Sequence, residues 1–218
     1  MRINPIVPPV RTDCFPSRSE RSLRMLTAEI PEKKKDLMEA TLKLVSSHGL
    51  EGVSTALIAK EASVGMGTLY RYFESKEELL RSVFESLRQE MLLVVMDGIG
   101  RSEASIFEQF KSIVKSLANY YIEHRLEFQF LQKYSDSSYM KDSYLDESAI
   151  ILDPISSILS SGGDDFKFLD LPVEMIFAMI YGPMIFTLQL AHLDRIELTE
   201  DRLNTIIQSI WTSITQPR

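Results

Sequence analysis

The sequence predicts an all-α protein in which a small N-terminal helix-turn-helix domain precedes a larger helical domain. Apolar residues recur at helical spacing almost everywhere from about residue 31 onward, and no stretch alternates convincingly as a strand would. Two very short helices separated by a turn are predicted between residues 54 and 73. The 218 residues, 44% of them hydrophobic, are enough to bury a core.

Composition and charge exclude several classes of protein. A single cysteine, Cys14, cannot form an internal disulfide, and no cysteines and histidines have the spacing of metal ligands. We therefore expect no metal or other cofactor, and a reducing, cytoplasmic location. Residues 1–80 have a net charge of +1, whereas residues 81–218 have a net charge of −8. Only the first part of the chain is expected to tolerate a polyanion.

Residues 1–28 contain five arginines and four prolines without a helical period, so we expect a disordered basic extension. The uncharged run from Ile3 to Val10 holds three prolines, which does not suit a secretory signal. Two interpretations remain open. The extension is either a basic arm that reaches a DNA groove or sequence ahead of the native start, because Met25 can serve as an initiator.

Residues 175–193 contain no Asp, Glu, Lys or Arg, a length near the roughly 20 residues that span a bilayer. Gly182 and Pro183 interrupt this run, Gln189 and His192 are polar, and no aromatic girdle or positive-inside bias flanks it. We therefore predict no membrane association but a helix buried on nearly every side. In a protein of this size, such burial indicates a second subunit.

The first helix is predicted to begin at Pro31 and to end at Gly49. Ser54 is a good N-cap for a helix that runs to about Glu61, and a second short helix should run from about Met66 to Tyr72. Segments of two turns are not stable alone, so their apolar residues must pack against the first helix. This arrangement leaves the outer face of the second short helix free.

That outer face carries residue types that suit DNA. Gly67 lets the backbone approach a duplex, and hydroxyl groups such as that of Tyr70 can donate to phosphate oxygens. Arg71 suits a phosphate or a guanine edge in the major groove. Lys76 lies in the first turn of the next helix, where it is placed to help hold a phosphate. The predicted DNA-binding residues are Ser54, Thr55, Gly67, Thr68, Tyr70, Arg71, Tyr72 and Lys76.

Residues 33–80 resemble the DNA-binding domain of TetR-family transcriptional regulators. The matching residues are Leu37, Ala40, Leu44, His48-Gly49, Ser54, Ile58-Ala59, Val64, Gly67-Thr68-Leu69-Tyr70, Tyr72-Phe73, Ser75-Lys76 and Leu79. The resemblance implies a homodimer of about nine helices that binds an operator and holds a ligand in its C-terminal domain. It also implies phosphate contacts from Ser54, Thr68, Tyr70, Tyr72 and Lys76.

Two positions depart from the family pattern. Ser63 stands where the family usually has a glycine in the turn, which costs on the order of 1 kcal/mol if that residue is left-handed. Gly65 stands where a serine or threonine often caps the recognition helix, at a cost of tenths of a kcal/mol. We predict no side-chain contact to DNA from position 65.

The rest of the chain is predicted to form a larger helical domain. We expect helices at about 76–96 and about 126–134, and a helical apolar stripe from 107 to 121. A further helix should begin at about residue 141, be kinked by Pro154 and end at Gly162-Gly163. The last helix should be capped by Thr199. A capping box, Ser75 to Glu78, should open the long helix at 76. The predicted domains are the extension 1–28, a DNA-binding domain 29–75, and a ligand-binding and dimerisation domain 76–218.

Two sets of residues in the C-terminal domain are candidates for binding. The candidates for an apolar ligand pocket are Phe110, Tyr121, Phe128, Tyr134, Tyr181 and Met184, although plain core packing is the alternative for most of them. The apolar helix and the last helix are expected to form a four-helix bundle across a two-fold axis. The residues predicted at that dimer interface are Met179, Phe186, Leu203, Ile207, Ile210, Trp211 and Ile214.

The motif and the resemblance together predict a cytoplasmic, non-enzymatic, homodimeric regulator that binds a double-stranded DNA operator. The family default is a repressor released from a palindromic operator by a small-molecule effector. The alternative is a helical dimeric adaptor that does not read DNA. An enzyme is disfavoured because the histidines beside carboxylates, His124 and His192, have no nucleophile motif or phosphate loop nearby.

Overall fold

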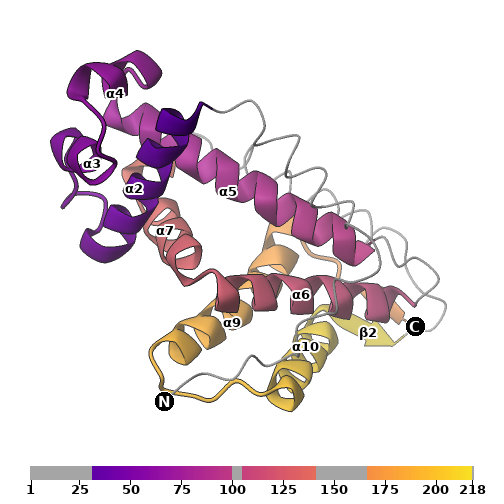
Figure 1. Ribbon diagram of the computed structural model, residues 1–218. Coiled ribbons are helices and arrows are strands. Elements are labelled where there is room, and N and C mark those ends of the chain that lie inside the picture. The colour runs from indigo at the N-terminus through magenta and orange to yellow at the C-terminus, as the bar shows by residue number, and fades with distance from the viewer. Residues whose placement is uncertain (1–30, 100–104, 141–165, 218) are drawn as a thin grey trace, which may run out of the picture. The chain divides into compact units, whose positions relative to one another are not determined.

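The computed structural model describes residues 31–99, 105–140 and 166–217 (Figure 1). These residues form eight α-helices, a short 3-10 helix and one pair of short strands, which confirms the all-α class. In chain order the elements are α2 (Glu32–His48), α3 (Thr55–Glu61), α4 (Met66–Tyr72), α5 (Lys76–Ile99), α6 (Ile106–Glu123), α7 (Arg125–Ser135), η1 (Ser138–Met140), β1 (Phe166–Phe168), α9 (Val173–His192), α10 (Glu200–Ile214) and β2 (Thr215–Pro217). The helix predicted from residue 141 and the extension 1–28 lie outside the described residues.

The chain divides into two compact units. Among the described elements, the first unit contains α2, α3, α4, the part of α5 up to Met91, α7 and η1. The second unit contains the part of α5 from Leu92 onward, α6, α9, α10 and the two strands. This division differs from the expected boundary at residue 75, because α7 packs against α2 although it comes much later in the chain.

Helix α2 begins after Pro31 and ends at Gly49, as predicted. Gly49 has φ of 76°, and its N–H donates to the carbonyl of Val45 at 2.8 Å. A positive φ favours glycine over other residues at a helix end. The apolar face of α2, which includes Leu37 and Leu44, is buried in the first unit.

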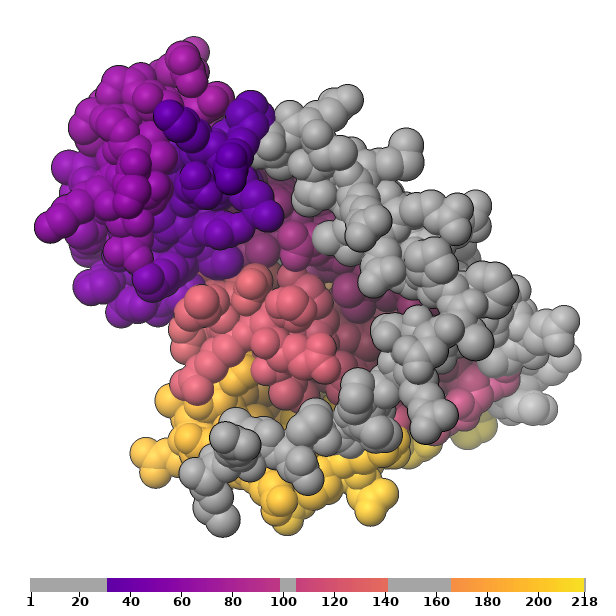
Figure 2. All heavy atoms as spheres, viewed as in Figure 1, coloured from indigo at the N-terminus to yellow at the C-terminus, as the bar shows by residue number. Residues whose placement is uncertain are grey.

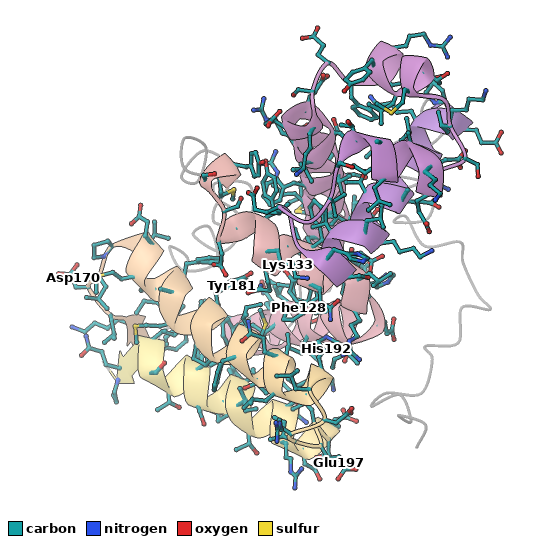
Figure 3. The ribbon with its side chains drawn as sticks, turned by 90° about the vertical axis from the view of Figure 1, so that its left-hand side faces the viewer. Phe128, Lys133, Asp170, Tyr181, His192 and Glu197 are labelled. Atoms are coloured by element: carbon teal, nitrogen blue, oxygen red, sulfur yellow. The ribbon has the colours of Figure 1, made fainter. Side chains whose placement is uncertain are left out.

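Helix α7 is joined to the carboxyl end of α2 by hydrogen bonds. Lys133, labelled in Figure 3, donates from Nζ to the carbonyls of Ser46 at 2.5 Å and Val45 at 3.2 Å. The Ser46 hydroxyl donates in turn to the carbonyl of Leu126 at 2.7 Å. Because the last carbonyls of a helix lack intrahelical partners and carry partial negative charge, an ammonium group stabilises them.

Aromatic packing dominates the second unit. The ring of Trp211 on α10 lies within 5.0–5.6 Å, between centroids, of the rings of Phe107, Phe110, Phe166 and Phe168. Strands β1 and β2 pair antiparallel, and Phe168 lies opposite Thr215. The sequence analysis found no convincing strand, and the structure corrects this. Each strand has only three residues, too few for a period of two to stand out.

Helix α9 is buried on one side only in the described structure. Its buried residues are Ile176, Ile180, Met184, Ile185 and Leu188. Met175 is 52% exposed and Phe186 is 62% exposed. The expectation of burial on nearly every side is therefore wrong within one protomer, because α6 and α10 cover a single face. By length and composition alone, α9 could cross a membrane, and a core helix of a soluble protein passes the same test.

Candidate nucleic-acid interface

The helix-turn-helix is built by local hydrogen bonds at both ends of α3. The Ser54 hydroxyl accepts a bond from the N–H of Leu57 at 3.2 Å, so the predicted N-cap is confirmed. At the other end, Ser63 has φ of 54°, in the left-handed region. The N–H of Ser63 donates to the Lys60 carbonyl and that of Val64 to the Ala59 carbonyl, at 3.1 and 2.9 Å. This pattern is a Schellman motif, which normally places glycine where this chain has Ser63.

Helix α4 starts from an extended Gly65 and has no side-chain cap. Its N–H groups are partly satisfied by the backbone, since Leu69 N–H donates to the Gly65 carbonyl at 3.1 Å. Leu69 is fully buried, and Phe73 and Ile58 are buried with it in the first unit. The inner residues therefore hold this two-turn helix in place and leave its other side in solvent.

The outer side of α4 exposes the predicted DNA-binding residues. Tyr70 is 52% exposed, Gly67 and Arg71 are exposed, and Thr68 and Tyr72 are half-buried. In Figure 2 the atoms of α2, α3 and α4, coloured indigo to purple, form one continuous mass. A Cβ placed on Gly67 meets no atom within 4 Å, so the space above it is open.

Two side-chain contacts hold the outer face of α4 in position. Thr55 at the start of α3 lies 3.3 Å, Oγ1 to Oη, from Tyr70. Arg71 donates to the hydroxyl of Tyr72 at 3.2 Å, and its guanidinium lies 5.0 Å from the centre of that ring. Because these groups are already ordered, they lose less conformational entropy when they bind a duplex.

Lys76 has a structural partner. Its Nζ donates to the carbonyl of Leu50 at 2.6 Å, which ties the first turn of α5 to the loop after α2. An ammonium group has three N–H donors, so this bond leaves two for a phosphate. Lys76 therefore stays a predicted phosphate contact that also stabilises the fold.

The start of α5 carries the predicted cap with one difference in detail. The Ser75 hydroxyl accepts from the N–H of Glu78 at 3.1 Å, but Glu78 Oε2 accepts from the N–H of Glu74 at 2.5 Å rather than from that of the N-cap. Hydrogen bonds from its own backbone N–H and from Ser75 lower the pKa of Glu77. A carboxylate at a helix N-terminus is stabilised in this way.

Met66 shares the outer face of α4 and was not among the predicted residues. It is 39% exposed and lies four residues before Tyr70, on the same side of the helix. Because Met66 lies three residues before the buried Leu69 and seven before Phe73, helical spacing gives no signal that it is exposed, and only the structure shows it. Apolar side chains in a recognition helix suit the methyl group of thymine.

The six ligand-pocket candidates are divided between the two units. Phe128 and Tyr134 are buried in the first unit, where Tyr134 stacks on Phe84 with 4.6 Å between ring centroids. Phe110 packs against Trp211 in the second unit, and Tyr181 stacks on Phe177. The structure thus gives most of these side chains core contacts, and it places Phe128 and Tyr134 in a different unit from the other four.

Tyr121 and Met184 are the most enclosed of the candidates in the second unit. Burial, together with the nearby Tyr181 and Tyr120, raises the pKa of Tyr121 well above its ordinary value. The His192 ring nitrogen Nε2 lies 3.0 Å from the Tyr121 carbonyl, and Figure 3 labels His192 and Tyr181 on α9. Met184 lines a cavity of about 10 Å³. A space of that size holds a single water molecule and no organic effector.

The predicted dimer residues have two different environments. Those on α10, namely Leu203, Ile207, Ile210, Trp211 and Ile214, are all buried within the protomer. On α9, Met179 is half-buried and Phe186 is largely exposed. Only the α9 residues leave substantial surface for a partner. Across the described ranges, no group of three or more His, Cys, Asp or Glu residues could hold a metal ion.

Comparisons with known proteins agree with this arrangement. Residues 37–83 match the family described as "Bacterial regulatory proteins, tetR family", and residues 77–216 match "Tetracyclin repressor-like, C-terminal domain". The second match covers well over half of the chain and includes α5 to α10.

The relatives that the chain matches include transcriptional regulators. The chain is 24% identical over 203 residues to the HTH-type transcriptional regulator PksA of Bacillus subtilis, covering 84% of this chain and 90% of that protein. It is 49% identical over 51 residues to the HTH-type transcriptional repressor KstR of Rhodococcus jostii, covering 23% of this chain and 24% of KstR. Some matches are thus short, and the chain spans about a quarter of KstR and a third of another relative, YhgD of Bacillus subtilis.

The fold also matches solved structures. A TetR family transcription regulator from Marinobacter aquaeolei superposes with a TM-score of 0.75 at 21% identity, covering 84% of this chain and 96% of that one. At this identity the likeness establishes the fold.

Proposed function

Because the chain belongs to the TetR family of bacterial regulatory proteins, we propose that it is a cytoplasmic, DNA-binding transcriptional regulator that acts as a homodimer. The observation that carries this proposal is the exposed face of α4. Gly67, Tyr70 and Arg71 lie in solvent while Leu69, between them in sequence, is fully buried. A helix held by its inner face and exposing donors on its outer face is built to enter a major groove.

The outer residues divide by the part of DNA they suit. Ser54, Thr68, Tyr70 and Tyr72 carry hydroxyl groups, and Lys76 carries an ammonium group, all of which bind phosphate oxygens without regard to sequence. Arg71, Met66 and the backbone at Gly67 are the groups that read bases, because they lie on or beside the exposed centre of α4. Phosphate contacts supply affinity, and base contacts supply specificity.

Dimerisation is supported by the exposed apolar residues of α9. Met175 and Phe186 are more than half exposed in the protomer, which is unfavourable in water and favours a second copy. Two α4 helices related by a dyad must lie about 34 Å apart to enter successive major grooves. The operator of such a dimer is palindromic.

The chain's organisation supports control by a small molecule. Helix α5 begins four residues after α4 ends, and its two parts belong to different compact units. A ligand that binds the C-terminal region more tightly in one dimer conformation alters the spacing of the α4 helices. We propose a repressor that such an effector releases from DNA.

A fluorescence-anisotropy titration tests DNA recognition. Two fluorescent duplexes, the intergenic DNA beside the chain's own gene and a scrambled sequence, are each titrated with the full chain at two salt concentrations. We expect tighter binding to the first duplex and weaker binding at higher salt. Tyr70→Phe should weaken both complexes alike, whereas Arg71→Ala should also reduce the ratio between them.

Arg195→Ala is the matched control. Arg195 is exposed in the turn after α9, so this substitution removes the same charge from the second unit. Equal, salt-independent binding to both duplexes, unchanged by Arg71→Ala, would contradict the proposal. That result would favour a dimeric adaptor that does not read DNA.

A further inference from the structure

Lys34 lies on the inner face of α2, where helical spacing would place an apolar residue. Leu37, Thr41 and Leu44, which are three, seven and ten residues further on, are all buried. Lys34 itself is half-buried, and its ammonium group lies over the ring of Phe73, 5.2 Å from the ring centroid. The inner stripe of α2 therefore begins with a cation that lies at the end of α4.

Phe73 fixes the position of this cation relative to the recognition helix. It is the C-cap of α4, it is only 1% exposed, and its N–H donates to the Leu69 carbonyl at 2.9 Å. Helix α2 packs against α4 in the first unit (Figure 1). In sequence, Phe73 lies between Tyr72 and Lys76, the two residues at this end of α4 that are proposed to bind phosphates. The ammonium group of Lys34 is thus placed at the same end of α4 as their hydroxyl and ammonium groups.

Within the described ranges, no carboxylate lies within 4 Å of the Lys34 ammonium group, although Glu74 directly follows Phe73. Lys35, by contrast, lies 3.6 Å from Glu39. The charge of Lys34 does not stabilise its own helix either, because it lies in the first turn of α2, where the positive end of the helix dipole repels a cation. This charge is therefore available to an anion from outside the chain.

We propose that Lys34 binds a backbone phosphate of the duplex, beside the phosphates that Tyr72 and Lys76 bind, when α4 lies in the major groove. This inference rests on the proposed function. The ring of Phe73 holds the ammonium group in place before DNA binds, so the side chain loses less conformational entropy in the complex. Because every sequence carries the same phosphates, Lys34 supplies affinity and no specificity.

Anisotropy titrations of the full chain between about 50 and 200 mM salt test this contact. Lys34→Met removes the charge and keeps a long unbranched side chain over Phe73. We expect the slope of log affinity against log salt to decrease in magnitude by about 1. Affinity near 0.1 M salt should fall by about eightfold, which is the contribution of one released counterion. Both losses should be the same for the intergenic and the scrambled duplex.

Three further variants separate the charge from the packing. Lys34→Arg keeps the charge and should keep the slope, whereas Lys34→Gln removes the charge with a side chain other than methionine and should repeat the loss. Lys35→Met is the matched control, because it removes the same charge from the neighbouring position, where the side chain is 62% exposed and paired with Glu39. It should change the slope by less than about half as much. Thermal unfolding of each variant shows whether the fold is kept.

An unchanged slope in both Lys34→Met and Lys34→Gln would overturn the proposal, as would an equal change in Lys35→Met. Lower thermal stability with an unchanged slope would assign Lys34 to a structural contact with Phe73 alone. These outcomes leave the proposed function intact if the parent chain prefers the intergenic duplex. A parent chain whose binding depends neither on salt nor on sequence would contradict the proposed function, and this inference with it.

Discussion

Helices α4 and α9 both leave large side chains in solvent, but the exposed groups are of opposite kinds. The exposed face of α4 presents glycine, a phenol and a guanidinium, whereas that of α9 presents Met175 and Phe186. Hydroxyl and guanidinium groups gain from a polyanion, and exposed apolar groups gain from another apolar surface. The chemistry of what a helix leaves exposed therefore indicates its partner better than its length or its periodicity does.

Both units combine polar contacts near helix ends with aromatic packing. In the first unit, Lys133 donates to the end of α2, Lys76 donates to the loop at Leu50, and Tyr134 stacks on Phe84. In the second unit, the His192 ring lies beside the Tyr121 carbonyl near the end of α6, and aromatic rings gather around Trp211. Hydrogen bonds fix positions more narrowly than ring contacts do, so the bonds of Lys133 and Lys76 suit a unit that must hold a short helix in place.

The largest effect is expected at the dimer contact proposed for α9. Phe186→Glu should weaken the dimer by about 3 kcal/mol, because it places a charge in an apolar interface. Since Phe186 is 62% exposed in the protomer, the variant should still fold. Analytical ultracentrifugation measures the association, and Lys167→Glu, at the exposed position of β1, is the control. An unchanged dimer affinity would show that α9 is not part of the interface.

A smaller loss is expected when α7 is detached from α2. Lys133→Met removes the donor to the carbonyls of Val45 and Ser46 and should lower the free energy of unfolding by about 2 kcal/mol. Lys111→Met, which removes a partly exposed ion pair with Glu108, should change the free energy of unfolding by less than about 0.5 kcal/mol. Urea unfolding measures both. Equal losses of unfolding free energy in the two variants would show that the Lys133 bonds to the end of α2 stabilise the protein no more than the Lys111 ion pair does.

Gly67→Ala separates recognition from folding. A Cβ at this position meets no atom within 4 Å, and alanine favours a helix, so thermal stability should be unchanged or higher. Specific DNA affinity should fall about tenfold, because the methyl group occupies the space that a duplex approaches. Anisotropy titration measures the affinity. A variant that binds its specific duplex as tightly as the parent would show that α4 does not approach DNA at Gly67.

The smallest effect concerns the turn before α4. Ser63→Gly should raise the free energy of unfolding by about 0.5 kcal/mol, since glycine adopts φ of 54° without strain. Ser47→Gly should instead lower the free energy of unfolding, because Ser47 lies within helix α2. Chemical denaturation compares the two. A destabilised Ser63→Gly variant would mean that the serine side chain contributes more than the strain costs.

Many helix ends could be predicted from local sequence. Ser54, Gly49 and Thr199 were predicted at helix ends and lie there, since capping depends on bonds between residues close in the chain. The left-handed conformation of Ser63 likewise follows from a motif of a few residues. The short strands were missed because their pairing joins residues far apart and each has too few residues to show alternation.

Amphipathicity did not distinguish a core from an interface. The apolar stripe of α10, from Leu203 to Ile214, was assigned to a dimer interface, and it is buried within its own protomer. An apolar face has the same sequence pattern whether its own chain or a second copy covers it. Residue spacing alone therefore cannot assign such a stripe.

The sequence by itself determined the helical class, the helix-turn-helix and the residue types that face outward from α4, because these depend on periodicity and on caps within a few residues. Only the tertiary structure decided that α7 packs on α2 through Lys133 and that Lys76 bonds to Leu50. Those features join residues 26 to 88 positions apart, and no local pattern records which distant partners meet.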